Sequence, residues 1–139
     1  MIWLKPYTLE EISTMQAQYL MAHLDIRLSG IGDDYLQATM PVDERTWMPY
    51  RILHGGASCV LAESVGSIAS ALVVDTTQYR PAGLEINASH LRGVSSGLVT
   101  GTARPFRLGR TTHVWDIHIT DEQDKLICIS RLTMAILKW

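Results

Sequence analysis

Residues 52–74, ILHGGASCVLAESVGSIASALVV, decide the fold of this chain. The stretch is rich in Ala and Ser, and its apolar residues recur with a helical period. At about 100° per residue, five of them fall on one stripe of a helix: Ala57, Leu61, Val65, Ile68 and Leu72. The opposite side receives small or polar residues and one carboxylate, namely Cys59, Glu63, Gly66, Ser67 and Ser70. The pattern predicts one long helix that buries its apolar stripe in the core.

The segments on either side of this helix have the patterns of a short helix and of strands. Thr8 and Glu11 form a capping-box pattern that predicts a helix over residues 9–19. Apolar and polar residues alternate, as they do in strands, over residues 24–28, 34–42, 83–91, 97–104, 112–120 and 125–137. Residues 43–51 read as an irregular loop, and residues 121–124 as a polar turn. This order predicts an α+β fold with one long helix on a mainly antiparallel sheet.

The length and composition bound the classes of protein. The 139 residues fit a single domain over residues 1–139. Because one helix can cover only one face of the sheet, we expect an oligomer that covers the rest. The net charge of -2 and the absence of Lys or Arg runs argue against nucleic acid as a partner.

Targeting, membrane and metal signals are absent from the sequence. Residues 1–7 lack the apolar core of a signal peptide, and no stretch is expected to span a membrane. We therefore expect a cytoplasmic protein. The five histidines have no zinc spacing, and the two cysteines are expected to be small buried apolar residues. No metal and no cofactor are predicted.

Two glycines stand where the irregular loop becomes the long helix. Gly55 and Gly56 would let a ligand or another backbone approach closely. The N–H groups of a first helical turn lack partners within the helix, and the helix dipole is positive there. These donors suit a developing oxyanion. The alternative is that the glycines only shape the turn.

Glu63 is the main candidate for chemistry. It is the only charged residue between His54 and Val74, whereas a solvated helix face normally carries several. Ser67 lies four residues on, so its hydroxyl is predicted to be within reach of the carboxylate. A lone carboxylate among small residues indicates a partly desolvated pocket group fit to act as base or nucleophile. An ordinary solvated Glu is the competing reading.

Basic side chains gather at two further places. His90 and Arg92 alternate with Leu91 on one predicted strand. The turn Arg107-Leu108-Gly109-Arg110, followed by Thr111 and Thr112, offers two guanidinium groups and two hydroxyls. Such a turn can hold phosphates through charge-assisted hydrogen bonds. A solvated turn and ordinary strand histidines are the competing readings.

Taken together, these motifs resemble the hotdog-fold acyl-CoA thioesterases that use a helix Glu, the PaaI-like group. LHGGASCVLAESVGSIAS carries the signature, and MPVDERT, GLEINASHLR, RLGRTTHVWDIHITDE and SRLTMAIL extend it. The likeness also takes in MIW and GDDYLQATMPVD, so it covers nearly the whole chain. It is strongest toward the branches that hydrolyse 1,4-dihydroxy-2-naphthoyl-CoA and that proofread enterobactin synthesis.

The resemblance implies a fold and a set of roles. A curved antiparallel sheet would wrap the long helix, two subunits would join edge to edge, and dimers would pair into a homotetramer. Glu63 would attack the thioester or activate water, and the Gly55 N–H of the facing subunit would polarise the thioester carbonyl. His54 would support that site, with Ser67 near the carboxylate. The CoA portion would meet Gly83, His90–Arg92 and the turn Arg107–Thr112.

Two residues depart from the family pattern. Met48 stands before Pro49 where relatives often have a Gln that helps orient the thioester or the water, and Met cannot replace its hydrogen bonds. Arg51 stands where close relatives have Gly. The resemblance as a whole implies hydrolysis of an acyl-CoA, with an aromatic acyl group favoured.

Three other functions stay open at this point. They are proofreading of acyl groups on an acyl or aryl carrier protein, binding of acyl-CoA without turnover, and, more weakly, hydration. The hydratase branch uses an Asp–His pair that is not found here.

Overall fold

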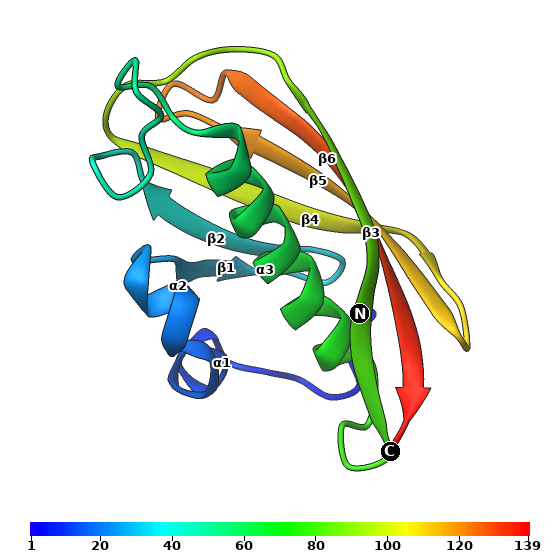
Figure 1. The fold of residues 1–139 in the computed structure, drawn as a ribbon. Coiled ribbons are helices and arrows are strands. Elements are labelled where there is room, and N and C mark those ends of the chain that lie inside the picture. Colours follow the sequence, from blue (N-terminus) through cyan, green and yellow to red (C-terminus); the bar gives the residue numbers. More distant parts are fainter.

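The computed structural model describes residues 1–139 as a sheet of six strands that curves around one long helix (Figure 1). The strand order is β1-β2-β4-β5-β6-β3, and all neighbours are antiparallel. The elements are α1 (Leu9–Gln16), α2 (Tyr19–His23), β1 (Arg27–Ile31), β2 (Leu36–Pro41), α3 (Gly55–Val73), β3 (Tyr79–His90), β4 (Leu98–Leu108), β5 (Thr112–Thr120) and β6 (Leu126–Lys138). This is the hotdog fold, and the α+β prediction is confirmed.

The predicted long helix is α3, and its apolar stripe is buried. Ala57, Leu61, Val65, Ile68 and Leu72 are each at most 9% exposed. The side opposite this stripe is also buried in part, because the curved sheet closes over it as well. The α-carbon of Gly66 lies close to Leu132, and Ser70 is fully buried.

The expectation that no stretch could span a membrane also needs correction. By length and composition α3 qualifies, with 19 residues and a mean hydropathy of 1.5. The fold explains the apolar composition, because α3 is the core helix and packs against β2 to β6. A helix surrounded by a sheet needs apolar residues on most of its circumference.

The first predicted helix and strand have different bounds in the structure. The helix predicted over residues 9–19 ends at Gln16, and a separate short helix, α2, follows. Tyr19 has φ 54 and Asp25 has φ 53, so the chain turns sharply at both. The second turn occupies residues 24 and 25, so the strand predicted from residue 24 begins at Arg27 instead.

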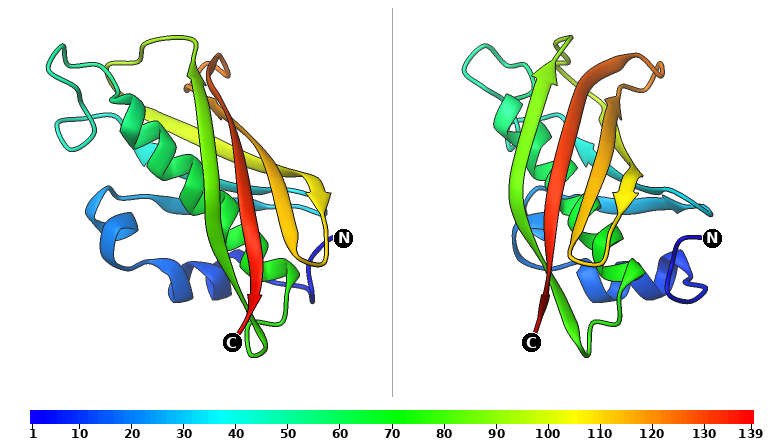
Figure 2. Two further views of the ribbon diagram at one scale, coloured as in Figure 1. Left: turned by 45° about the vertical axis from the view of Figure 1, so that its right-hand side comes forward. Right: turned by 90° about the vertical axis from the view of Figure 1, so that its right-hand side faces the viewer.

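The later strands were predicted in the right order, but β3 and β4 are longer than expected. β3 begins at Tyr79 and runs through Pro81, and β4 continues through Pro105 to Leu108. Both prolines stand where no neighbour needs their missing N–H. β3 pairs only with β6, and the pairing of β4 with β2 stops at Ala103. As a result β3 is a 12-residue edge strand beside α3 (Figure 2).

Candidate active site

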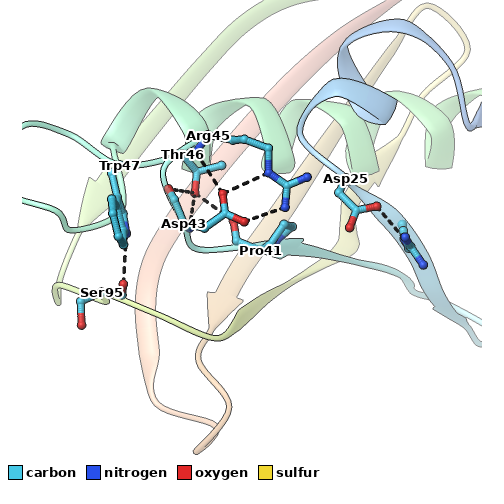
Figure 3. A network of polar contacts seen from close by, with 8 residues as sticks. Asp25, Pro41, Asp43, Arg45, Thr46, Trp47 and Ser95 are labelled. Carbon is cyan, nitrogen blue, oxygen red and sulfur yellow. Dashed lines mark hydrogen bonds and ion pairs between the residues drawn. The ribbon is translucent and has the colours of Figure 1, made fainter.

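The loop between β2 and α3 is held in place by a polar network (Figure 3). The buried hydroxyl of Thr46 donates to the Pro41 carbonyl at 2.9 Å and accepts from the Asp43 N–H at 3.2 Å. The Asp43 carboxylate pairs with Arg45, whose guanidinium lowers the pKa of Asp43. Farther along, the Trp47 indole N–H donates to the Ser95 carbonyl at 3.0 Å. The loop is therefore fixed to β2 and to the segment before β4.

His54 begins α3 as its N-cap residue. Its backbone N–H donates to the Thr46 carbonyl at 2.8 Å, and its Nδ1 accepts from the Gly56 N–H at 2.8 Å. Nδ1 is thus unprotonated, and any ring proton is on Nε2. The Gly55 N–H, at the first position of the helix, forms no hydrogen bond within the chain. An unpaired N–H at the positive end of a 19-residue helix is available to a ligand.

A cavity of about 340 Å³ opens at this end of α3. Five of the predicted site residues line it, although they come from three separate parts of the sequence: Met48, Gly55, His90, Leu91 and Arg92. The remaining wall is Ile52, Leu53, Ser58, Gly93 and Ile127. The His90 ring lies so close to Gly55 that a Cβ there would be 2.8 Å from Nε2. The cavity thus has one apolar side and one side with a helix N–H, an imidazole and a guanidinium.

The two departures from the family pattern lie on the loop above the cavity. Met48 lines it with a side chain that offers no hydrogen-bond donor. Arg51 has φ 59, the left-handed region in which glycine is most comfortable. The exposed Arg51 side chain forms no ion pair. A backbone position of this kind explains why glycine would suit the site.

Glu63 lies farther along α3, against β3. It is partly buried, and a Cβ added to Gly83 would be 2.5 Å from its Oε1. The carboxylate therefore lies directly on the α-carbon of Gly83, in space that only glycine leaves free. The predicted contact of Ser67 with Glu63 is not formed. The Ser67 hydroxyl is instead 3.7 Å from the Met134 sulfur on β6.

The arginine turn lies at the opposite end of α3. Leu108, Gly109 and Arg110 line a second cavity, of about 310 Å³, together with Val73, Val74, Asp75, Tyr79, His113 and Ile136. Arg107 is exposed and reaches back over Gly109. The Thr111 carbonyl accepts from the Ile136 N–H, and Thr112 pairs with Ala135, so these two residues fix the turn to β6. Neither arginine forms an ion pair.

Two buried residues in these cavities were not predicted as site residues. Ser58 is 2% exposed and lines the first cavity. His113 is also 2% exposed and lines the second. The Ser70 hydroxyl accepts from the Trp115 indole at 2.7 Å and lies 3.1 Å from His113 Nδ1. Burial lowers the pKa of His113. The one sequence feature that could have pointed to Ser58 is its spacing of three residues from Gly55, which puts both on the same face of the helix.

The cysteines take no part in these cavities. Cys128 is buried and Cys59 is partly buried, and neither is in a disulfide. Burial raises the pKa of Cys128 to about 11 and also raises that of Cys59. Both thiols are therefore protonated at neutral pH. No group of three His, Cys, Asp or Glu side chains is placed to hold a metal ion.

The predicted site residues thus lie at three places along α3: at its start, beside Glu63, and at its end. Glu63 is eight residues after Gly55, which at a rise of ~1.5 Å per residue separates them by about 12 Å along the helix. Glu63 and the unpaired Gly55 N–H of one chain are therefore more than two helical turns apart.

A helix wrapped by an antiparallel sheet, with a partly buried carboxylate and an unpaired N–H at its start, defines the class of hotdog-fold thioester hydrolases. The sequence profile of the thioesterase superfamily matches residues 50–128. The chain belongs to the thioesterase superfamily and is a thioester-hydrolysing enzyme.

The chain is similar over its full length to named relatives. It is 51% identical to the 1,4-dihydroxy-2-naphthoyl-CoA hydrolase of Escherichia coli, over 99% of this chain and 100% of that protein. It is 47% identical to the proofreading thioesterase EntH of Cronobacter turicensis, over 99% of both chains.

Solved structures agree with this. A mutant thioesterase from Pseudomonas aeruginosa, with a glutamine changed to alanine, has 51% identity, complete coverage of both chains and a TM-score of 0.97. Two mutants of a Staphylococcus aureus protein are 38% identical to this chain and have TM-scores of 0.85 and 0.84. The matches cover 87% and 86% of this chain, and 100% and 99% of theirs. One lacks a glutamate and the other a glutamine 15 positions before it, which is the separation of Met48 from Glu63.

Proposed function

We propose that this enzyme hydrolyses acyl-CoA thioesters, preferably aromatic ones, at a site shared by two copies of the chain. One observation carries the proposal. Glu63 lies against the edge strand β3, and the unpaired Gly55 N–H lies eight residues earlier, about 12 Å away along the axis of the same helix. A second copy supplies the missing partner for each.

The edge strand β3 supports such a pairing. One side of β3 pairs with β6, and the other side has no partner over 12 residues. Long unpaired edges with exposed apolar residues such as Leu84 favour pairing with another chain. If two β3 strands pair antiparallel about a point between Gly83 and His90, each His90 approaches the other Gly83. Glu63 of one copy then faces the cavity beside Gly55 of the other.

The chemistry follows from the two groups. The Gly55 N–H donates to the thioester carbonyl oxygen and stabilises the negative charge that develops there. Glu63 either attacks the carbonyl carbon or removes a proton from the attacking water. The C–S bond breaks, CoA leaves as the thiol, and water supplies the oxygen of the free acid. His54, held by its hydrogen bond to Gly56, keeps the start of the helix in shape.

The CoA portion is assigned to the basic residues around the two cavities. Arg92, with His90 and Leu91, forms the wall beside Gly55, and Arg107 and Arg110 extend over the turn that ends at Thr112. Guanidinium groups without ion pairs can form charge-assisted hydrogen bonds with phosphates. In the shared site the turn and Glu63 come from one copy, and the Gly55 cavity comes from the other. The pantetheine arm runs between them.

The acyl preference is inferred from the wall of the Gly55 cavity. Met48, Ile52 and Leu53 present an apolar surface suited to a flat ring. The similarity to a hydrolase of 1,4-dihydroxy-2-naphthoyl-CoA supports an aromatic acyl group. A carrier-protein thioester is the second candidate, favoured by the 47% identity to EntH. Both substrates present a pantetheine thioester and differ only in the group outside the site.

Release of free thiol from a panel of aromatic and straight-chain CoA esters tests the proposal. The wild type should prefer the aromatic esters, and Glu63→Gln should lose about 10²–10⁴-fold in kcat with little change in KM. Absence of thiol release by the wild type from every ester would overturn the function. Full activity of Glu63→Gln would overturn the assignment of the carboxylate.

A further inference from the structure

Four hydroxyl-bearing residues are buried, and two of them, Ser58 and Ser130, have a hydroxyl that forms no hydrogen bond within the chain. Ser70, also on α3, has its hydroxyl bonded to Trp115 and His113, and the buried Thr46 hydroxyl is bonded to Pro41. Ser58 is 2% exposed, yet its hydroxyl forms no hydrogen bond within the chain. A buried polar group without a protein partner is unfavourable unless another partner satisfies it. Such a group needs a reason.

Ser58 is part of the wall of the Gly55 cavity. The only fully enclosed side-chain polar atom without a partner is Ser130 Oγ, so the Ser58 hydroxyl keeps access to the cavity space. The Ser58 hydroxyl is therefore accessible to a molecule bound in the cavity, whereas the Ser130 hydroxyl is enclosed in the core.

Helix geometry brings Ser58 toward the Gly55 N–H. Gly55 is the first residue of α3, and Ser58 is three residues later, so both lie on the same face. Side chains on a helix tilt toward its N-terminus, which is the direction in which the free N–H of Gly55 points. The two donors thus converge on one region of the cavity. His54 is the N-cap and holds this turn in place through Gly56.

We propose that Ser58 is a catalytic residue that donates the second hydrogen bond to the thioester carbonyl oxygen, beside the Gly55 N–H. The inference rests on the proposed function and extends it. A carbonyl oxygen that becomes an oxyanion has room for two donors, and fixed donors stabilise the transition state more than the ground state. The hydroxyl hydrogen turns toward the oxygen when the substrate binds. Its missing partner in the free enzyme is then the substrate itself.

Ser58→Ala tests this role with a small structural change, since Ala is a strong helix former. Removing one donor of an oxyanion site costs roughly 100-fold in kcat, with KM changed little. Ser58→Thr keeps a hydroxyl and should recover most of the loss. The matched control is Ser130→Ala, which removes another unpartnered buried hydroxyl outside the cavity and should keep wild-type kcat.

A binding measurement separates a catalytic hydroxyl from a structural one. An S-alkyl-CoA thioether has no carbonyl oxygen, so Ser58→Ala should bind it as tightly as the wild type does. Weaker thioether binding together with a lowered melting temperature would assign Ser58 a structural role and overturn the proposal. A kcat of Ser58→Ala within twofold of the wild-type value would also overturn the proposal. If Ser58→Ala is fully active while Glu63→Gln is not, the proposed function stands and only the role of Ser58 fails.

Discussion

The contact between Glu63 and Gly83 allows the position of the carboxylate to be tested without changing it. In Gly83→Ala the new Cβ would be 2.5 Å from Glu63 Oε1, whereas ordinary contact begins at 3.4 Å. The carboxylate must therefore retreat by about 0.9 Å. The backbone tolerates Ala, because Gly97 is the only glycine with a positive φ. The flexible Glu side chain moves more readily than either strand or helix.

The expected effect of Gly83→Ala is on the rate and not on the fold. A displacement of about 1 Å can cost on the order of 100-fold when a catalytic group must be positioned, so kcat should fall about 10- to 100-fold. The melting temperature should stay level or rise, since Ala restricts the unfolded chain more than Gly does. Thiol release from an aromatic CoA ester gives kcat, and calorimetry gives the melting temperature.

Gly30→Ala is the matched control for this experiment. Gly30 lies in β1, and a Cβ there would be 2.7 Å from Oε1 of Gln37, which is also the end of a flexible side chain. It should leave kcat unchanged. Equal kcat values for Gly83→Ala and the wild type would refute the placement of the Glu63 carboxylate. A melting temperature of Gly83→Ala clearly below that of the wild type would refute the claim that the backbone tolerates Ala at this position.

Three further predictions concern the cavities. Arg110→Ala should raise KM for CoA esters and leave kcat nearly unchanged, because a remote phosphate contact is equal in ground and transition states; an unaltered KM in the double variant with Arg107→Ala would remove the turn from the site. Met48→Gln should raise kcat by up to about tenfold by adding a hydrogen bond to the water or the thioester, and steady-state kinetics showing no change would place Met48 away from the reacting atoms. Burial holds the pKa of His113 below 6.5, so the unfolded chain takes up the proton first, and the free energy of unfolding should fall as pH drops below 6.5 until the folded pKa is passed. Urea unfolding at about pH 7.5 and about pH 5.5 should show a smaller decline for His113→Gln, and an equal decline would contradict the assignment.

The sequence was most informative about the long helix. The period of Ala57, Leu61, Val65, Ile68 and Leu72 sets both the helix and its buried stripe, because packing against a sheet requires that spacing. Local patterns were less informative about element ends. Tyr19 and Asp25 adopt left-handed backbone conformations, which are uncommon for residues other than glycine and do not follow from a periodic pattern.

The prolines show why the strand ends were missed. The predicted strands began after Pro81, at residue 83, and ended before Pro105, at residue 104. Proline cannot donate a hydrogen bond to a ladder, so its place in a strand depends on whether a donor is needed there. Whether a donor is needed depends on the neighbouring strand, and that is decided by the order β1-β2-β4-β5-β6-β3. The alternation of residues within one strand does not show which strands will be its neighbours.

The candidate site divides in a similar way. Glu63 could be identified because it is the only charge on an apolar helix. The meeting of Met48 with Gly55 and His90 depends on the path of the loop and the length of β3, so only the family resemblance suggested it. Ser58 looked like one more small helix residue, and only its burial without a hydrogen-bond partner distinguishes it.

Mixing two inactive variants tests most directly whether the site is shared between copies. Glu63→Gln removes the carboxylate function. Gly55→Pro removes the N–H at the first helical position, where the helix accepts proline, and His54 already has the extended backbone that precedes proline. The His90 ring, which would be 2.8 Å from the new Cβ, must turn aside to make room. Each variant alone should be almost inactive. After unfolding and refolding together, half of the dimers are mixed, and each mixed dimer contains one intact site, so about a quarter of wild-type activity should return. If the mixture stays as inactive as its components while the wild type survives the same refolding, Glu63 and Gly55 do not act across two copies.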